Sequence, residues 1–109
     1  MADDLAIDWD NANIDHIACH RVTPLEVEQL FANRAVDIDF DVVNGEERWT
    51  SIGHTEQLRI LVVVWTMREE SIRPVTAFEA DKRLAKEYLA KIGLYGHGEQ
   101  SGKTEGSKI

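Results

Sequence analysis

Three arginines flank the most apolar part of the chain and are the first candidates for chemistry. Arg59, Arg68 and Arg73 lie at or near the ends of an expected strand pair spanning residues 59–75. A guanidinium group binds phosphate oxygens through paired N–H donors, so arginines around a buried strand pair would form a scaffold for a phosphate. The alternative interpretation is that these arginines are solvated side chains that mark strand ends. The spacing alone leaves both interpretations open.

Three further polar residues have side chains suited to acid–base chemistry or anion binding. His20 falls between two expected helices. It is either a general acid or base, because an imidazole exchanges protons near neutral pH, or an ordinary polar residue between helices. Glu47 and Arg48 follow an expected hairpin turn, where they would face a ligand. Alternatively, Arg48 pairs across that hairpin with Asp41.

Two groups of potential metal ligands lack a complete ligand set. Asp37, Asp39 and Asp41 alternate along one expected strand, but the glycine and the distant glutamate of a calcium-binding loop do not follow. An acidic strand face of this kind discourages pairing with other sheet edges. His16 and His20 have the helical spacing of zinc ligands, yet no third ligand is evident. The sequence therefore predicts neither a metal site nor a cofactor.

The strand pair that carries the arginines is expected to form the centre of the sheet. Residues 60–65 are an unbroken run of β-branched, aliphatic and aromatic residues, which is typical of a strand buried on both faces. Polar residues 68–71 interrupt the run, and residues 72–75 resume the extended pattern. Two such runs around a short polar break predict a hairpin.

A second hairpin is predicted just before the central one. Residues 36–42 alternate apolar and acidic side chains, which predicts a half-buried strand. Asn44-Gly45 is the preferred pair for a two-residue type I′ turn. This turn sets a register that places Phe40 opposite Trp49, an aromatic pair that stabilises the hairpin.

Capping signals predict three helices. Asp10 is a good N-cap after a short edge strand at residues 5–9, and Thr23-Pro24-Leu25-Glu26 is a capping box with proline in the first turn. A second capping box at residues 76–79 predicts a C-terminal helix that ends at Gly93. The fold class is therefore α+β, with a mostly antiparallel four- to five-stranded sheet, two N-terminal helices and one C-terminal helix.

Size and charge limit the function classes. The chain has 109 residues, enough for one domain, which we expect over residues 1–95. Residues 1–58 carry 3 Lys/Arg against 13 Asp/Glu, whereas residues 59–95 carry 7 against 5, so a local basic face is compatible with the net charge of −8. The chain shows neither a membrane span nor a signal peptide, and Cys19 is its one cysteine. We expect a cytoplasmic protein without membrane contact.

A series of short motifs, taken in order, resembles the BrnT family. The motifs are Ile7-Asp8-Trp9-Asp10, Asn13-Ile14, His20-Arg21-Val22-Thr23, Gly45-Glu46-Glu47-Arg48-Trp49, Leu61-Val62-Val63-Val64 and Ile72-Arg73. The resemblance covers roughly residues 5–92. The chain departs from the family at Cys19, Arg21, Ser71 and Phe78, where the family has Lys, Gly, Arg and Arg.

The resemblance implies both a fold and a function. The family has a RelE-like fold, and its members are toxins of type II toxin–antitoxin pairs. The implied activity is that of a metal-independent ribonuclease that inhibits translation, with RNA as the substrate. The implied partner is a small DNA-binding antitoxin, with which the chain would form a hetero-oligomer. A catalytically inactive protein-interaction module on the same fold is the alternative.

The resemblance also assigns roles to the polar residues. These residues are His20, Glu47, Arg48 and Arg73 for catalysis and Arg59 and Arg68 for RNA binding. His20 or Glu47 would act as the acid or base, and the arginines would stabilise the charged phosphorane formed when a ribose 2′-hydroxyl attacks the adjacent phosphorus.

Residues 96–109 are predicted to form a disordered tail that contributes nothing to stability, because their one apolar residue is the last. Truncation after Tyr95 should leave the thermal unfolding midpoint unchanged within about 2 °C. Differential scanning calorimetry of the two chains checks this expectation, and a larger drop would show that the tail docks on the domain.

Overall fold

The computed structural model describes residues 6–93, so the predicted tail at residues 96–109 lies outside the described residues. The helices and strands are α1 (Asn11–Ala18), α2 (Pro24–Ala32), β1 (Val36–Val43), β2 (Glu46–His54), β3 (Ile60–Arg68), β4 (Ser71–Glu79) and α3 (Lys82–Lys91). The strands form one antiparallel sheet in the order β1-β2-β3-β4. This architecture confirms the predicted α+β fold class.

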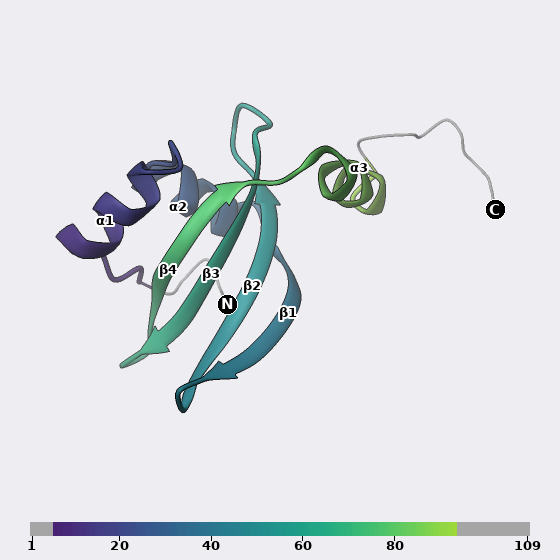
Figure 1. Ribbon diagram of the computed structural model, residues 1–109. Coiled ribbons are helices and arrows are strands. Elements are labelled where there is room, and N and C mark those ends of the chain that lie inside the picture. The colour runs from purple at the N-terminus through teal and green to yellow at the C-terminus, as the bar shows by residue number, and fades with distance from the viewer. Residues whose placement is uncertain (1–5, 94–109) are drawn as a thin grey trace.

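The helices cover the two faces of the sheet unequally (Figure 1). Helix α2 lies behind the sheet, α1 lies along its β4 side, and α3 lies over the upper end of the other face. We call this second face, which carries Thr66, Thr76 and Phe78, the open face. Its lower part has no helix over it (Figure 1).

Strand β3 is buried on both faces, as its apolar run predicts. Leu61 and Val63 belong to the hydrophobic cluster formed with α1 and α2. Ile60 and Val62 belong to a second cluster, which α3 completes with Tyr88. Because successive side chains of a strand point to opposite faces, a single strand joins the two clusters.

The first two helices begin where the sequence predicts. Asp10 caps α1 by accepting a hydrogen bond from the Asn13 backbone N–H, and the Asn13 side-chain Oδ1 accepts one from the Asp10 backbone N–H. Thr23 and Glu26 form the predicted capping box of α2. No helix within residues 6–93 is long and apolar enough to cross a membrane.

The β1–β2 hairpin has the predicted register but not the predicted burial. Phe40 pairs with Trp49 across the strands, and their ring centroids lie 5.4 Å apart. Asn44 and Gly45 have φ angles of 53° and 81°, as a type I′ turn requires. The expectation of a half-buried strand is wrong, since six of the eight residues of β1 are exposed, Phe40 and Val42 among them. The helices that would cover this end of the sheet end before they reach it (Figure 1).

Two expected boundaries are also wrong. The N-terminal strand at residues 5–9 is reduced, within the described residues, to a single parallel bridge between Ile7 and Ile72. Residues 76–79 are strand rather than the first turn of a helix, because Phe78 pairs with Val62 and Glu79 with Leu61. The ladder to β3 therefore prevails over the capping signal, and α3 begins after the N-cap Asp81.

The turn between β3 and β4 is tighter than the sequence suggests. Glu69 and Glu70 alone connect the strands, with φ angles of 52° and 70°. Both glutamates therefore adopt the left-handed conformation that favours glycine or asparagine. The closing pair, Arg68 and Ser71, still belongs to the ladder.

Glu70→Gly should stabilise the protein by about 1 kcal/mol, because glycine relieves the left-handed strain at some cost in unfolded-chain entropy. Urea denaturation of the two proteins measures the difference. Glu56→Gly, at an exposed loop position without positive φ, should destabilise instead. A Glu70→Gly protein no more stable than wild type would show that the turn carries no strain.

Candidate functional site

The largest concentration of arginines on the open face lines a cleft of about 400 Å³ between the sheet and α1. The lining residues are Ala12, Asn13, His16, Glu46, Arg48, Thr66, Arg68, Arg73, Pro74, Val75 and Thr76. Thr66 pairs with Arg73 across β3 and β4, which directs both side chains to the same face. Three arginines from β2, β3 and β4 therefore meet at one place.

Arg48 is more weakly paired than Arg73. Its Nη2 lies 3.7 Å from Glu46 Oε1, a loose ion pair, and its side chain is 32% exposed. The predicted pairing with Asp41 brings the two residues opposite each other in the ladder, but the ion pair is formed with Glu46 instead. Among the residues that the structure describes, Arg48 Nε is the one buried side-chain nitrogen or oxygen without a hydrogen-bond partner. A buried donor of this kind favours an added acceptor.

Arg73 is held by two carboxylates from the N-terminal segment. Its Nη2 lies 2.9 Å from Asp10 Oδ2, and its Nη1 lies 3.4 Å from Asp8 Oδ2. The side chain of Arg73 is 15% exposed. These two contacts orient the guanidinium and neutralise much of its charge, so Arg73 is less available to an anion than Arg48.

The buried carboxamide of Asn13 determines where α1 and the N-terminal segment lie relative to β4. Its Nδ2 donates to the carbonyl oxygens of Asp8 and Pro74, at 2.9 and 3.2 Å, while its Oδ1 accepts from the Asp10 N–H. Only 4% of Asn13 is exposed. The residue therefore positions both carboxylates that bind Arg73.

The other candidate arginines differ in position and in partners. Arg68 lines the cleft and is exposed. Arg59 lies outside it, and its Nη1 donates to both carboxylate oxygens of Glu26, at 2.9 and 3.0 Å, and to the Arg21 carbonyl at 2.7 Å. Arg59 thus joins the start of β3 to α2.

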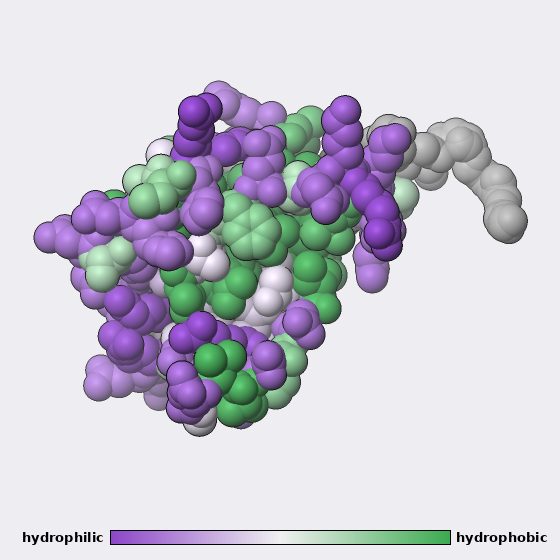
Figure 2. All heavy atoms as spheres, in the orientation of Figure 1, coloured by the Kyte–Doolittle hydropathy of each residue, from purple (hydrophilic) through white to green (hydrophobic). Residues whose placement is uncertain are grey.

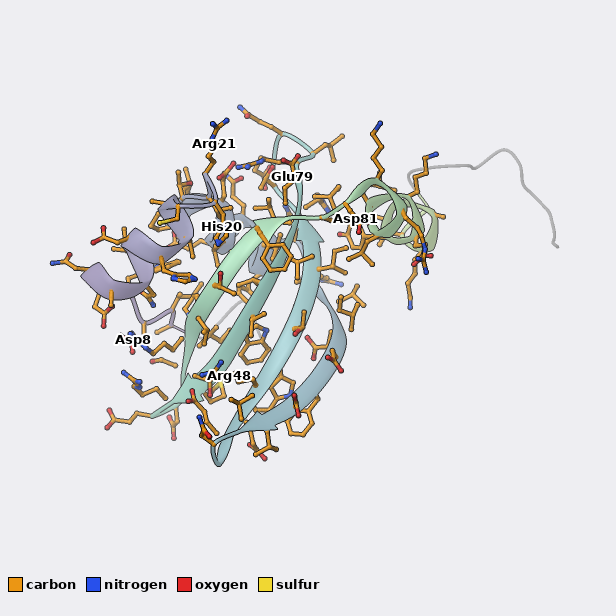
Figure 3. The ribbon with its side chains drawn as sticks, in the orientation of Figure 1. Asp8, His20, Arg21, Arg48, Glu79 and Asp81 are labelled. Carbon is orange, nitrogen blue, oxygen red and sulfur yellow. The ribbon has the colours of Figure 1, made fainter. Side chains whose placement is uncertain are left out.

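The two candidates for acid–base chemistry do not line the cleft. Glu47 follows Glu46 on β2, and strand alternation directs it to the face opposite Arg48. His20 lies at the upper end of α1, well separated from Arg48 along the sheet (Figure 3). The ring centroid of His20 is 6.2 Å from that of Phe78, and Phe78 pairs with Val62 in the ladder. Val62 precedes the cleft residue Thr66 by four residues along β3, a distance of about 13 Å.

His16 is the imidazole that does line the cleft. Its ring centroid lies 5.8 Å from that of His20, one helical turn further along the chain. His20 lies just beyond the C-cap Cys19 of α1, in the turn that follows the helix. The sequence could have identified His16 only if the side of α1 that faces β4 had been known. Within residues 6–93, no three His, Cys, Asp or Glu side chains gather closely enough to hold a metal ion.

Asp10 is the one acidic group around the cleft whose titration is clearly displaced. The hydrogen bond from the Asn13 backbone lowers the pKa of Asp10 below its ordinary value of 3.8, burial opposes this, and Arg73 lowers it further. Because the pKa is lower in the folded protein, the ionised carboxylate stabilises the fold above the unfolded pKa, and this stabilisation disappears as the pH falls through the folded pKa.

Asp10→Asn should therefore be less stable than the wild type at pH 7, whereas the two proteins should converge in stability as the pH falls below 3.8. Asparagine retains the N-cap, so the change removes the charge alone. Thermal unfolding at pH 7 and at pH 3 measures both differences. Asp15→Asn, an exposed position of the same helix, serves as the control and should show no such convergence.

A comparison with protein families agrees with this architecture. The model of one family, described as the ribonuclease toxin BrnT of type II toxin–antitoxin systems, matches residues 9–83. A search of curated proteins finds no significant match. The matched segment begins at Trp9, contains α1, α2 and all four strands, and ends in the first turn of α3. Because it covers more than half of the 109 residues, the chain belongs to the BrnT family of ribonuclease toxins.

Proposed function

We propose that this chain cleaves RNA without a metal ion, using the cleft around Arg48, and thereby inhibits translation in the cytoplasm. The observation that carries the proposal is the buried, unpartnered Nε of Arg48. A phosphate oxygen would complete its hydrogen bonding and would add charge complementarity. Arg68 and the Arg73 guanidinium lie in the same cleft and would bind neighbouring oxygens.

The proposed reaction begins at a ribose 2′-hydroxyl. Its oxygen attacks the adjacent phosphorus while a base removes its proton, the bond to the 5′-oxygen breaks, and an acid protonates that oxygen. The products are a 2′,3′-cyclic phosphate and a 5′-hydroxyl. Arginines that contact the phosphorane stabilise the charge that develops in the transition state.

His16 is our first candidate for the acid or base, since it lines the cleft together with Arg48 and Arg73. His20 is the second candidate, because its ring lies next to that of His16. The His20 imidazole would exchange a proton either with His16 or with a nucleotide bound beside the end of α1. Glu47 is the third candidate, and it would need substrate to reach the opposite face of β2. The proposal gives Arg59 a more distant role, through its contact with α2.

The family implies an antitoxin, and we propose that it is a small DNA-binding protein that forms a hetero-oligomer with this chain. The net charge of −8 is complementary to a basic partner. Phe40 and Val42, about half exposed on β1 at the edge of the sheet, would supply apolar contact.

One observation favours the alternative of a non-enzymatic interaction module. Arg73 is bound by Asp8 and Asp10, and Arg59 by Glu26, while Arg48 is loosely paired with Glu46, so three of the four candidate arginines already have carboxylate partners. A phosphate would have to compete with these carboxylates. Retention of antitoxin binding together with a complete lack of RNA cleavage would support this alternative.

Arg48→Ala should lower the rate of RNA cleavage by about 10²–10³-fold, as expected when one donor to a developing negative charge is removed. The assay measures cleavage of a fluorescent RNA by the purified protein at low salt, with EDTA and with Mg²⁺. Cleavage should persist in EDTA and leave a 2′,3′-cyclic phosphate. Arg83→Ala provides a matched control, because Arg83 on α3 is 88% exposed and, among residues 6–93, pairs only with Glu87.

Three outcomes would contradict the proposal. Equal cleavage by the wild type and Arg48→Ala would exclude the cleft as the site. Cleavage that requires Mg²⁺ would contradict metal independence. Intact RNA in every reaction, together with normal cell growth and normal cell-free translation in the presence of the wild type, would leave the interaction module as the function.

A further inference from the structure

The open face continues beyond the cleft toward α3, and an aromatic ring is exposed there. Phe78 lies near the end of β4 and is 39% exposed. It is part of neither hydrophobic cluster of the described residues, although its ladder partner Val62 is buried under α3. Hydrophobic residues gather over the middle of this face, between hydrophilic margins (Figure 2).

Phe78 shares its face with the cleft. Its ladder pair with Val62 follows the pairs Thr66–Arg73 and Val64–Thr76 along the same two strands. Alternate residues of a strand point to one face, so Thr66, Val64 and Val62 share a side, and their partners share it with them. The row from Arg73 through Thr76 to Phe78 is therefore continuous.

A second ring meets Phe78 at an angle. The His20 ring centroid is 6.2 Å away, and the planes of the two rings differ by 65°. His20 is exposed, and the label in Figure 3 shows it at the upper end of α1 beside β4. The two rings thus form a solvent-exposed corner, in which Phe78 comes from β4 and His20 from the turn after α1.

We infer that this corner of Phe78 and His20 binds a base of single-stranded RNA by stacking, on the same RNA strand whose phosphate lies at Arg48. The inference rests on the proposed function, since it extends the same binding site by a base-binding subsite. A flat, exposed aromatic ring stacks with any base, and stacking of this kind is tolerant of sequence. The row of residues that leads to it contains the hydroxyl of Thr76, which lines the cleft.

The chemistry of the corner favours a base over a phosphate. Phe78 and its ladder partner Val62 carry no charge, so the sheet side of the corner offers no cation to a second phosphate. The cleft therefore supplies cations for the backbone of the RNA, and the corner supplies an aromatic surface for a base.

Binding of 2′-O-methyl RNA tests the inference, because the blocked 2′-hydroxyl prevents cleavage. The probes are a fluorescein-labelled octamer of 2′-O-methyluridine and an abasic 2′-O-methyl octamer with the same backbone, both measured by fluorescence anisotropy at low salt. Phe78→Leu should weaken binding of the uridine octamer about tenfold and leave binding of the abasic octamer unchanged. Phe78→Trp should restore or strengthen binding of the uridine octamer.

Matched variants separate this inference from the proposed function. Phe40→Leu removes another exposed ring, from the opposite face of the sheet, and should bind both probes as the wild type does. Arg48→Ala should weaken binding of both probes. Thermal unfolding of each variant confirms that it is folded.

The outcomes are distinct. If Phe78→Leu binds the uridine octamer as tightly as the wild type, or loses affinity for both probes equally, the base-binding subsite is wrong, while loss of binding in Arg48→Ala would still support the cleft. If Arg48→Ala also binds both probes like the wild type, the proposed function fails as well.

Discussion

The arrangement of the candidate site depends on one buried side chain, the carboxamide of Asn13. It binds the Asp8 carbonyl, the Asp10 N–H and the Pro74 carbonyl, and so connects the N-terminal segment, α1 and β4. The contact with the Pro74 carbonyl is buried, where a polar group left without a partner would cost about 1–3 kcal/mol, and the other two contacts are part-buried. Because α1 is held in this way, His16 faces the cleft and the two aspartates reach Arg73.

The arginines of this protein have two different roles, and the number and closeness of their carboxylate partners decide which role each one has. Arg59 and Arg73 are each bound by carboxylates and connect elements of the fold. Arg48 has a loose ion pair and an unpartnered Nε, so it retains binding capacity.

The unequal cover of the sheet connects the fold to the proposed chemistry. Strand β3 requires apolar cover on both faces at its start, and α2 and α3 provide it there. Toward the other end of the strand, Thr66 and its partner Arg73 replace apolar residues on the open face. That part of the sheet needs no helix over it, and it is where we propose that RNA binds.

Local sequence signals determined much of this protein. The caps at Asp10 and Thr23 fix where two helices begin, and Asn44-Gly45 fixes the β1–β2 register, because each depends on backbone hydrogen bonds within a few residues. The apolar run of β3 identified the centre of the sheet for a similar reason, since burial on both faces excludes polar side chains. The motif order also identified the family.

Tertiary structure decided what local signals could not. Residues 76–79 satisfy a helix-capping pattern, yet the ladder to β3 holds them as strand, because pairing with a distant segment contributes more than one local cap. The exposure of Phe40 depends on where α1 and α2 end in space, which its alternating pattern does not encode. Whether an arginine is free or paired likewise depends on carboxylates from distant parts of the chain, such as Asp8 for Arg73. The sequence therefore determined which side chains are available, and the three-dimensional contacts between distant segments decided which of them face the cleft.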